Sequence, residues 1–399
     1  MALEQIILLL FIGYFIFTID KKQKNFPVPM VLLLLGIGLS FIPFFSDITI
    51  SHTLIYEIFL PALLFISAYQ FPFSNLKEHL GIIVTLSTVG LLLTAMLLGG
   101  SIYFISDPFL SISFISALLI ASLLTPTDPV SVVSILKKSA NNPKIADVVE
   151  GESMVNDGTS IVFFTVLTGI YIGEHSFSFT TFVVDFLKVS LGGVAIGILF
   201  GWLVSRAVHL TSHRQYQVML SIVLAYGSFM IAEHLGVSGV LASVGAGIML
   251  SWEFDHTIKE SHYREYLDSF WEVIEPTILS LIFLLIGIHT TNYLNPSAWI
   301  FILIIFVLSI FIRFIVLYGI ISVFPQWKNE YNLKEISLIT WSGIRGTMTV
   351  ALLLSFETEA SGDGQTIITL TFGVVLLSLI LQSITIYPLS NLLQRKKNR

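Results

Sequence analysis

The sequence predicts an all-α polytopic membrane protein, and three observations indicate this class. Hydrophobic residues make up 55% of the 399 residues, charged residues only 12%, and the mean hydropathy is +0.87. A soluble domain could not bury so much apolar surface. The apolar residues also fall into runs of roughly 17–25 residues, the length at which a helix crosses a bilayer. Lysine and arginine are confined mainly to alternate connections between these runs, as expected for basic cytoplasmic loops.

The apolar runs predict thirteen transmembrane helices, at about 2–19, 27–45, 52–70, 80–106, 111–136, 145–172, 181–208, 215–235, 237–251, 266–289, 297–323, 332–356 and 365–393. The segments 215–235 and 237–251 are separated by little more than Gly236, so one broken helix is the alternative there. Residues 2–19 precede the basic run 21–24, which is opposite to the order in a cleavable signal peptide. We therefore expect them to remain as the first helix.

The basic residues test the count of thirteen. With the N-terminus outside, seventeen of the twenty lysines and arginines lie on the cytoplasmic side, together with the C-terminus. The other three, Lys188, Arg313 and Arg345, lie within spans. Merging 215–235 with 237–251 would place Lys328 and Lys334 outside, so the charges favour two helices. We expect a multi-pass protein of the cell (inner) membrane, with the N-terminus outside and the C-terminus in the cytoplasm.

Composition also excludes several classes of site. The chain has no cysteine, which excludes disulfides and thiolate metal sites. Its formal charge of −6 gives no support for nucleic-acid binding. No sequence feature indicates a cofactor.

The thirteen helices divide as six, one and six within a single transmembrane domain, 1–399. The first repeat covers about 1–172, a linking helix about 181–208, and the second repeat about 215–393. The first helix of one repeat starts outside and that of the other starts inside. Two inverted repeats of this kind are a common plan among secondary transporters.

The fifth and twelfth helices are both interrupted midway. Residues 125–129 read Thr-Pro-Thr-Asp-Pro, and residues 342–346 read Ser-Gly-Ile-Arg-Gly. The prolines should free the carbonyls of Ser122 and Thr125, while the glycines permit unwinding. Ordinary kinks are the alternative, since Pro and Gly are common in membrane helices. A charge at each break, Asp128 and Arg345, favours an ion site at the membrane midplane.

The sixth helix carries the predicted chemistry. Ser153, Asn156 and Asp157 recur at helical i+3 and i+4 spacing, with Glu152 beside them. Acids at membrane depth are functional candidates by default. Hydroxyl, amide and carboxylate oxygens suit a hard monovalent cation, and Asp157 can bind a proton instead. One carboxylate that binds either species, never both, suffices to couple their opposite movements.

These residues carry a resemblance. Residues 147–158, Asp-Val-Val-Glu-Gly-Glu-Ser-Met-Val-Asn-Asp-Gly, resemble the signature of the monovalent cation:proton antiporters of the sodium/proton exchanger type, which include the bacterial NhaP-like proteins. Five further runs also resemble motifs of this family and occur in the family's order along the chain, at 60–65, 127–130, 237–242, 283–287 and 341–346. The resemblance covers nearly the whole chain.

The resemblance implies roles for individual residues. Asn156 and Asp157 match the family's Asn-Asp pair, with Asp157 the ion and proton carrier. Thr127, Asp128 and Ser153 match positions that line the ion site. The expected cation is sodium, with lithium and potassium as alternatives, and we expect electroneutral exchange.

The resemblance also implies three fixed charges beyond the carrier. Glu152 matches a glutamate that pairs with an arginine of the eleventh helix, here Arg313, as a structural ion pair. Arg345 matches the arginine at the twelfth-helix crossing, where it would compensate helix ends and Asp128. For Asp128 a purely structural alternative is the cap of a half-helix that begins near Pro129.

The resemblance further implies a homodimer and a transport bundle, around spans 3–6 and 10–13, that moves against the rest. One departure concerns the third helix, where relatives commonly carry an acid and this chain has Ile66 and Ser67. That leaves cation preference and pH response open. The rival classes are a passive cation channel and an intramembrane aspartyl enzyme.

Overall fold

The computed structural model describes residues 3–23, 28–46, 48, 53–128, 132–133, 136–137, 144–173, 179–207, 213–256, 261–290, 293, 296–357 and 363–394. Within these residues the secondary structure is helical, with no strand. The predicted all-helical class is therefore confirmed.

Helix is present in every one of the thirteen predicted spans. The corresponding elements are α1 (Leu3–Gln23), α2 (Val28–Ser40), η1 with α4 (Leu54–Phe59, Leu60–Gln70), the continuous α5–η2–α6 (Phe73–Thr85, Leu86–Gly90, Leu91–Ser106), α7 (Phe114–Leu123), α9 (Lys144–Tyr171), α10 (Phe179–Ala207), α11 (Arg214–His234), α12 (Gly239–His256), α13 (Ser261–Thr290), α14 (Trp299–Val323), the pair α16 and α17 (Leu333–Ser342, Thr347–Glu357), and α18–η5–α19 (Gly364–Leu377, Ser378–Gln382, Ser383–Gln394). Short turns α3 (Pro43–Ser46), η4 (Pro296–Ala298) and α15 (Pro325–Glu330) join them.

Length and apolarity alone identify fewer membrane crossings. Among the described residues, seven helices meet both criteria, and the bent pair α16–α17 raises the number to eight. The helix α2, the pair η1–α4 and α7 are apolar but shorter, and α9 carries several charges. The protein is a multi-span membrane protein, whereas thirteen crossings stay a prediction.

The helices α11 and α12 are separate, as the count of thirteen requires. A turn with Gly236 at φ +69° follows α11, and Val237 N donates to Ala232 O at 3.0 Å across it. Glycine adopts this left-handed conformation without the penalty that a side chain brings.

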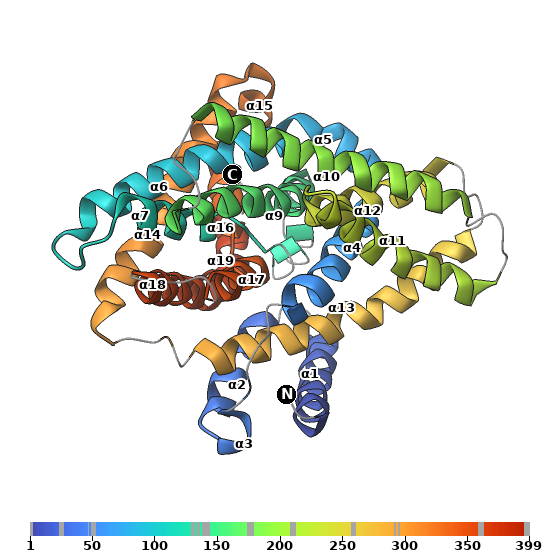
Figure 1. The fold of residues 1–399 in the computed structure, drawn as a ribbon, viewed down its shortest axis with the longest axis horizontal. Helices are drawn as coiled ribbons and strands as arrows, with labels where there is room; N and C mark the ends of the chain where they lie inside the picture. The colour runs from blue at the N-terminus through green and yellow to red at the C-terminus, as the bar shows by residue number, and fades with distance from the viewer. Residues whose placement is uncertain are drawn as a thin grey trace, which may run out of the picture.

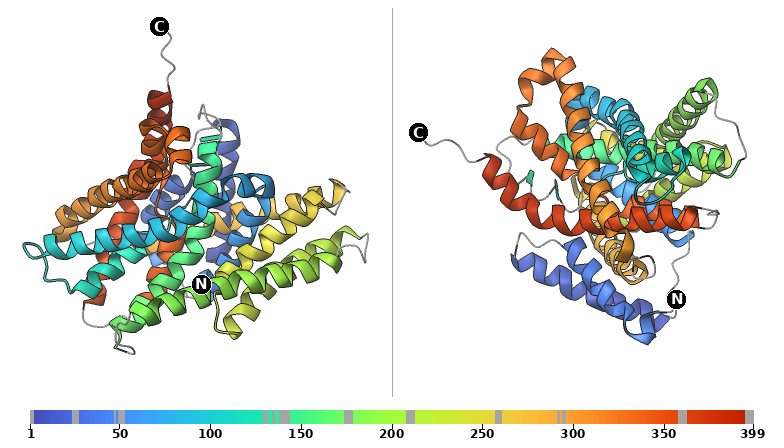
Figure 2. Two further views of the ribbon diagram at one scale, coloured as in Figure 1. Left: turned by 90° about the horizontal axis from the view of Figure 1, so that it is seen from above. Right: turned by 90° about the vertical axis from the view of Figure 1, so that its left-hand side faces the viewer.

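The helices form two packed groups that meet at α9. In Figure 1, α10 to α13 extend to one side, and α1 and α2 pack below on α13, whereas α6, α7, α14 and α18 lie on the other side. The right-hand view in Figure 2 shows α1 and α2 as a pair at the edge of the molecule. The central α9 contacts α7, α17 and α5 from one group and α12 and α10 from the other.

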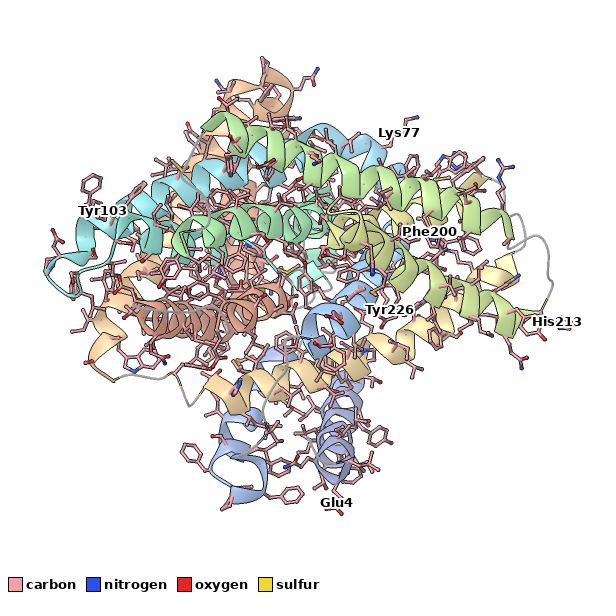
Figure 3. The ribbon with its side chains drawn as sticks, viewed as in Figure 1. Glu4, Lys77, Tyr103, Phe200, His213 and Tyr226 are labelled. Carbon is pink, nitrogen blue, oxygen red and sulfur yellow. The ribbon has the colours of Figure 1, made fainter. Side chains whose placement is uncertain are left out.

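Three connections that the charge pattern places on one side of the membrane meet at Lys144. Its Nζ lies 3.0 Å from Glu78 Oε1 and 2.7 Å from Glu330 Oε1. Hydrogen bonding and the positive charge of Lys144 lower the pKa of the exposed Glu78 carboxyl. Nearby Lys77 projects from the periphery of the molecule (Figure 3).

Candidate ion site at the crossing of two broken helices

Both predicted breaks are present, and they cross. The helix α7 ends at Leu123, and residues 124–128 are not helical. The helix α16 ends at Ser342 and α17 begins at Thr347, with a 43° bend between them. The backbone N–H of Asp128 donates to Ile344 O at 2.7 Å, which joins one break to the other.

The carbonyls that the prolines were expected to free accept side-chain hydrogen bonds. Ser122 O accepts from Thr125 Oγ1 at 2.7 Å, and Thr125 O accepts from Asn156 Nδ2 at 3.1 Å. Pro126 lies in the described break, whereas Pro129 falls outside the described residues. Of the half-helix expected after Pro129, only residues 132–133 and 136–137 are described, and these are helical. The broken backbone is thus satisfied partly by α9.

Asp128 lies at the N-terminus of α17. Its Oδ2 accepts hydrogen bonds from Thr347 N and Thr347 Oγ1, both at 3.2 Å. A helix N-terminus favours a negative charge, since its first N–H groups lack partners within the helix. Gly346 is required for this approach, because a Cβ there would lie 2.3 Å from Asp128 Oδ2. Sequence reasoning missed Thr347, although a threonine directly after a glycine break is a recognisable signal.

Arg345 lies between the ends of two half-helices. Its Nε donates to Leu124 O at 3.0 Å, and its Nη1 donates to Gly343 O. These carbonyls follow the C-termini of α7 and α16, where the helix dipole is negative. The side chain is fully buried. The geometry therefore places a cation against both C-terminal ends, whereas compensation of Asp128 by Arg345 stays a prediction.

The predicted carrier is buried on α9. Asp157 is 9% exposed. Within the part of the chain that the structure describes, Asp157 Oδ1 and Asn156 Oδ1 have no hydrogen-bond partner. Buried acceptors without partners are rare, and each calls for a ligand, a proton or water. Ser153 Oγ and Thr127 Oγ1 are 2.8 Å apart, which joins α9 to the break after α7.

Asp157 and Asp128 line one cavity of about 320 Å³. Its wall is formed by side chains from α4, α9, α13, α17, the first break and the residues that follow that break, namely Leu60, Leu63, Leu64, Ser67, Gln70, Asp128, Val133, Lys137, Glu150, Met154, Asp157, Glu275, Leu279 and Thr347. Lys137 and Glu150 form an ion pair at 2.8 Å in this wall, and the Lys137 side chain is 50% exposed. The cavity therefore leads from a partly exposed ion pair to the two buried carboxylates.

The face of α9 that meets the cavity differs from the expected one. The lining residues Glu150, Met154 and Asp157 follow i, i+4, i+7 spacing. Asn156 lies about 100° around the helix from Asp157 and faces a small internal space lined by Glu152, Arg313 and Arg345. Among the five residues grouped by sequence, Thr127, Ser153 and Asn156 are not part of the cavity lining.

Glu152 and Arg313 face each other across α9 and α14. Glu152 Oε2 and Arg313 Nη2 lie 2.8 Å apart, and both side chains are buried. Arg313 also packs under the second break, where a Cβ on Gly343 would lie 2.7 Å from Arg313 Nε. This arrangement neutralises two charges inside the bundle, next to the crossing.

The departure on the third helix has a structural counterpart. Ser67 of α4 lines the cavity, while Ile66 is buried elsewhere. Two acids that sequence reasoning did not select, Glu150 and Glu275, also line it. An intramembrane acid followed by proline, Glu275-Pro276, was a signal that could have identified one of them.

Comparisons with known proteins match sodium/hydrogen exchangers over nearly the whole chain. Residues 6–392 match the family described as sodium/hydrogen exchanger, transmembrane. The Na(+)/H(+) antiporter ApNhaP of Aphanothece halophytica is 32% identical over 387 residues, covering 96% of this chain and 73% of that protein. The Na(+)/H(+) antiporter NhaH of Halobacillus aidingensis is 32% identical over 401 residues, with 96% of each covered.

A solved structure shares the fold. The sodium proton antiporter MjNhaP1 from Methanocaldococcus jannaschii superposes with a TM-score of 0.78, covering 98% of each chain at 23% identity. At that identity the likeness establishes the arrangement of helices and leaves the roles of individual residues to be argued from this chain.

Proposed function

The chain belongs to the sodium/hydrogen exchanger family, a family of transporters and not of enzymes, and we propose that Asp157 carries its exchange of sodium ions for protons. The observation that supports this assignment most directly is the Asp157 carboxylate. Asp157 lines the cavity, and its buried Oδ1 has, among the described residues, no hydrogen-bond partner. A proton or a sodium ion would satisfy that oxygen, and the two compete for it.

Asp128 is the second ligand in this proposal. Because Thr347 and the N-terminus of α17 stabilise its negative charge, it stays ionised while Asp157 exchanges its load. The hydroxyl of Thr347 lines the same cavity and adds a neutral oxygen ligand. Thr127, Ser153 and Asn156 then act by holding the first break against α9, through the Thr127–Ser153 and Asn156–Thr125 contacts.

Alternating access would come from a bundle formed by spans 3–6 and 10–13, which moves against the remaining helices around the crossing. The two inverted six-helix repeats and the linking helix α10 belong to this proposal. So does a homodimer, which the family resemblance implies. The N-terminus would lie outside and the C-terminus in the cytoplasm of the cell membrane. Lys144 forms ion pairs with Glu78 and Glu330, which belong to two other connections between helices. These contacts support placing all three connections on one side of the membrane.

With that orientation the cavity opens to the cytoplasm, because Lys137 belongs to a connection on the basic side. The described state is then inward-facing, with Asp157 accessible to cytoplasmic sodium. Coupled exchange requires that the protein does not change between its inward-facing and outward-facing states while Asp157 is empty. The empty carboxylate would then be an uncompensated buried charge, which is costly.

Purified protein in proteoliposomes tests this function. A sodium gradient should drive proton movement, followed by fluorescence dequenching over a scan of sodium, lithium and potassium and of pH. A passive cation channel is the rival, and it would conduct sodium without a proton gradient. Sodium current in the absence of proton movement would contradict the exchange mechanism.

A further inference from the structure

The wall of the cavity opposite α9 carries an acid that the exchange mechanism does not yet use. Glu275 and Leu279 of α13 both line the cavity, one helical turn apart. The Glu275 side chain is half-buried. Among the described residues, no hydrogen bond or ion pair involves its carboxylate.

Glu275 differs in this respect from the other acid near the cavity mouth. Glu150 is compensated by Lys137, with Glu150 Oε2 and Lys137 Nζ 2.8 Å apart. The lining as a whole holds four carboxylates, on Asp128, Glu150, Asp157 and Glu275, against one ammonium group, on Lys137. A concave site lined by one sign of charge concentrates the opposite ion. The local excess of negative charge therefore favours cation entry, and Glu275 supplies the part of it nearest α13.

The cavity also has the size and the neutral ligands that a partly hydrated ion needs. Its volume of about 320 Å³ exceeds the roughly 30 Å³ that one water occupies in the liquid several times over. Ser67 and Gln70 of α4 contribute oxygen atoms to the same wall. Hard monovalent cations prefer such carboxylate, hydroxyl and amide oxygens.

We infer that Glu275 forms an entry subsite that binds the monovalent cation between the cavity mouth and Asp157, and thereby sets the affinity for cytoplasmic sodium. This inference rests on the proposed exchange at Asp157. Glu275 is a specificity-determining residue and not the carrier, so its loss should weaken cation capture without removing the exchange step. The carboxylate that α4 lacks at Ile66 and Ser67 is supplied to the cavity from α13 instead.

The test uses Glu275→Gln, which removes the charge and keeps the size. In inside-out membrane vesicles, where the cytoplasmic face meets the bath, we expect the KM for sodium to rise about five- to tenfold with an unchanged maximal rate. Glu265→Gln is the matched control, since Glu265 is an exposed acid on the same helix and does not line the cavity. It should keep the wild-type KM.

Glu275→Ala is the second variant, which adds no atoms to the cavity and must show the same rise. The amount of folded protein is checked by thermal stability in detergent. A wild-type KM in either folded variant overturns the inference, as does a fall in maximal rate at constant KM. These outcomes leave the proposed function intact, whereas wild-type vesicles without sodium-dependent proton movement would contradict the function itself.

Discussion

The helix–helix seams of the molecule and the crossing of its broken helices are built on opposite principles. At the seam between α2 and α13 the backbones touch: a Cβ on Gly36 would lie 2.2 Å from Leu284 O, and one on Gly287 2.2 Å from Leu33 O. The seam between α10 and α12 repeats this at Gly197, where a Cβ would lie 2.1 Å from Ala242 O. Small residues allow such close packing between membrane helices.

The crossing instead brings together buried charges and interrupted backbone. Arg345, Asp128 and the Glu152–Arg313 pair are buried there, each with polar contacts to a helix end or to each other. Van der Waals contact fixes the seams, so they transmit motion as rigid units. Charge balance holds the crossing, so under the proposed mechanism its state would depend on which ion is bound. Substitutions should accordingly affect stability at the seams and transport at Asp157.

The largest effect is expected at Asp157. Asp157→Asn should abolish sodium-dependent proton movement in proteoliposomes, because the amide binds neither species in exchange for the other. Thermal stability in detergent should be retained, since among the described residues no partner of Asp157 Oδ1 is lost. Asp147→Asn, on the same helix and outside the cavity lining, is the control and should still exchange. Near wild-type exchange by Asp157→Asn would refute its role as carrier.

The next effect is on the stability of the crossing. Glu152→Gln or Arg313→Met alone should destabilise the protein by about 3–5 kcal/mol, because each leaves the other buried charge unpaired. The double substitution should recover part of this loss. Thermal unfolding in detergent measures all three variants. If the single losses simply add in the double variant, the two side chains do not interact energetically.

A smaller effect on stability is expected at the seam between α2 and α13. Gly36→Ala should destabilise the protein by about 1–3 kcal/mol, because the added methyl meets backbone atoms of α13. Gly38→Ala makes the same chemical change two residues away on α2, where nothing lies within 4 Å of the added Cβ. Its thermal stability should match or exceed that of the wild type. Equal stability of the two variants would show that α2 and α13 can separate without cost.

The smallest effect is that of membrane potential, which we expect to be absent. Asn156, beside the carrier, cannot ionise, and in the proposed mechanism Asp128, which accepts a hydrogen bond from the N-terminus of α17, does not exchange a proton. The loaded carrier therefore has the same charge with a proton or a sodium ion. A potassium–valinomycin potential, imposed at matched pH and sodium in a variant shown not to carry potassium, should leave exchange unchanged. Uphill proton movement driven by that potential would rule out a single-carboxylate mechanism.

The sequence by itself determined the helical class, both helix breaks and the candidate acids. Hydropathy, proline and glycine act on the backbone within a few residues, so interruptions at 125–129 and 342–346 were expected from local chemistry alone. In the structure, residues 124–128 and 343–346 are non-helical. The cost of a charge at membrane depth marked Asp157 without reference to its neighbours. The separation of α11 from α12 at Gly236 was also local.

Only the tertiary structure decided which of these groups meet. That Thr347 binds Asp128, that Glu150, Met154 and Asp157 form the cavity face of α9, and that Glu275 reaches the same cavity all depend on the rotation of each helix about its axis. Each residue along a helix turns its side chain by about 100°, so neighbours such as Asn156 and Asp157 face different partners. Packing against other helices, including the glycine seams, sets that rotation, and it involves residues far apart in the chain.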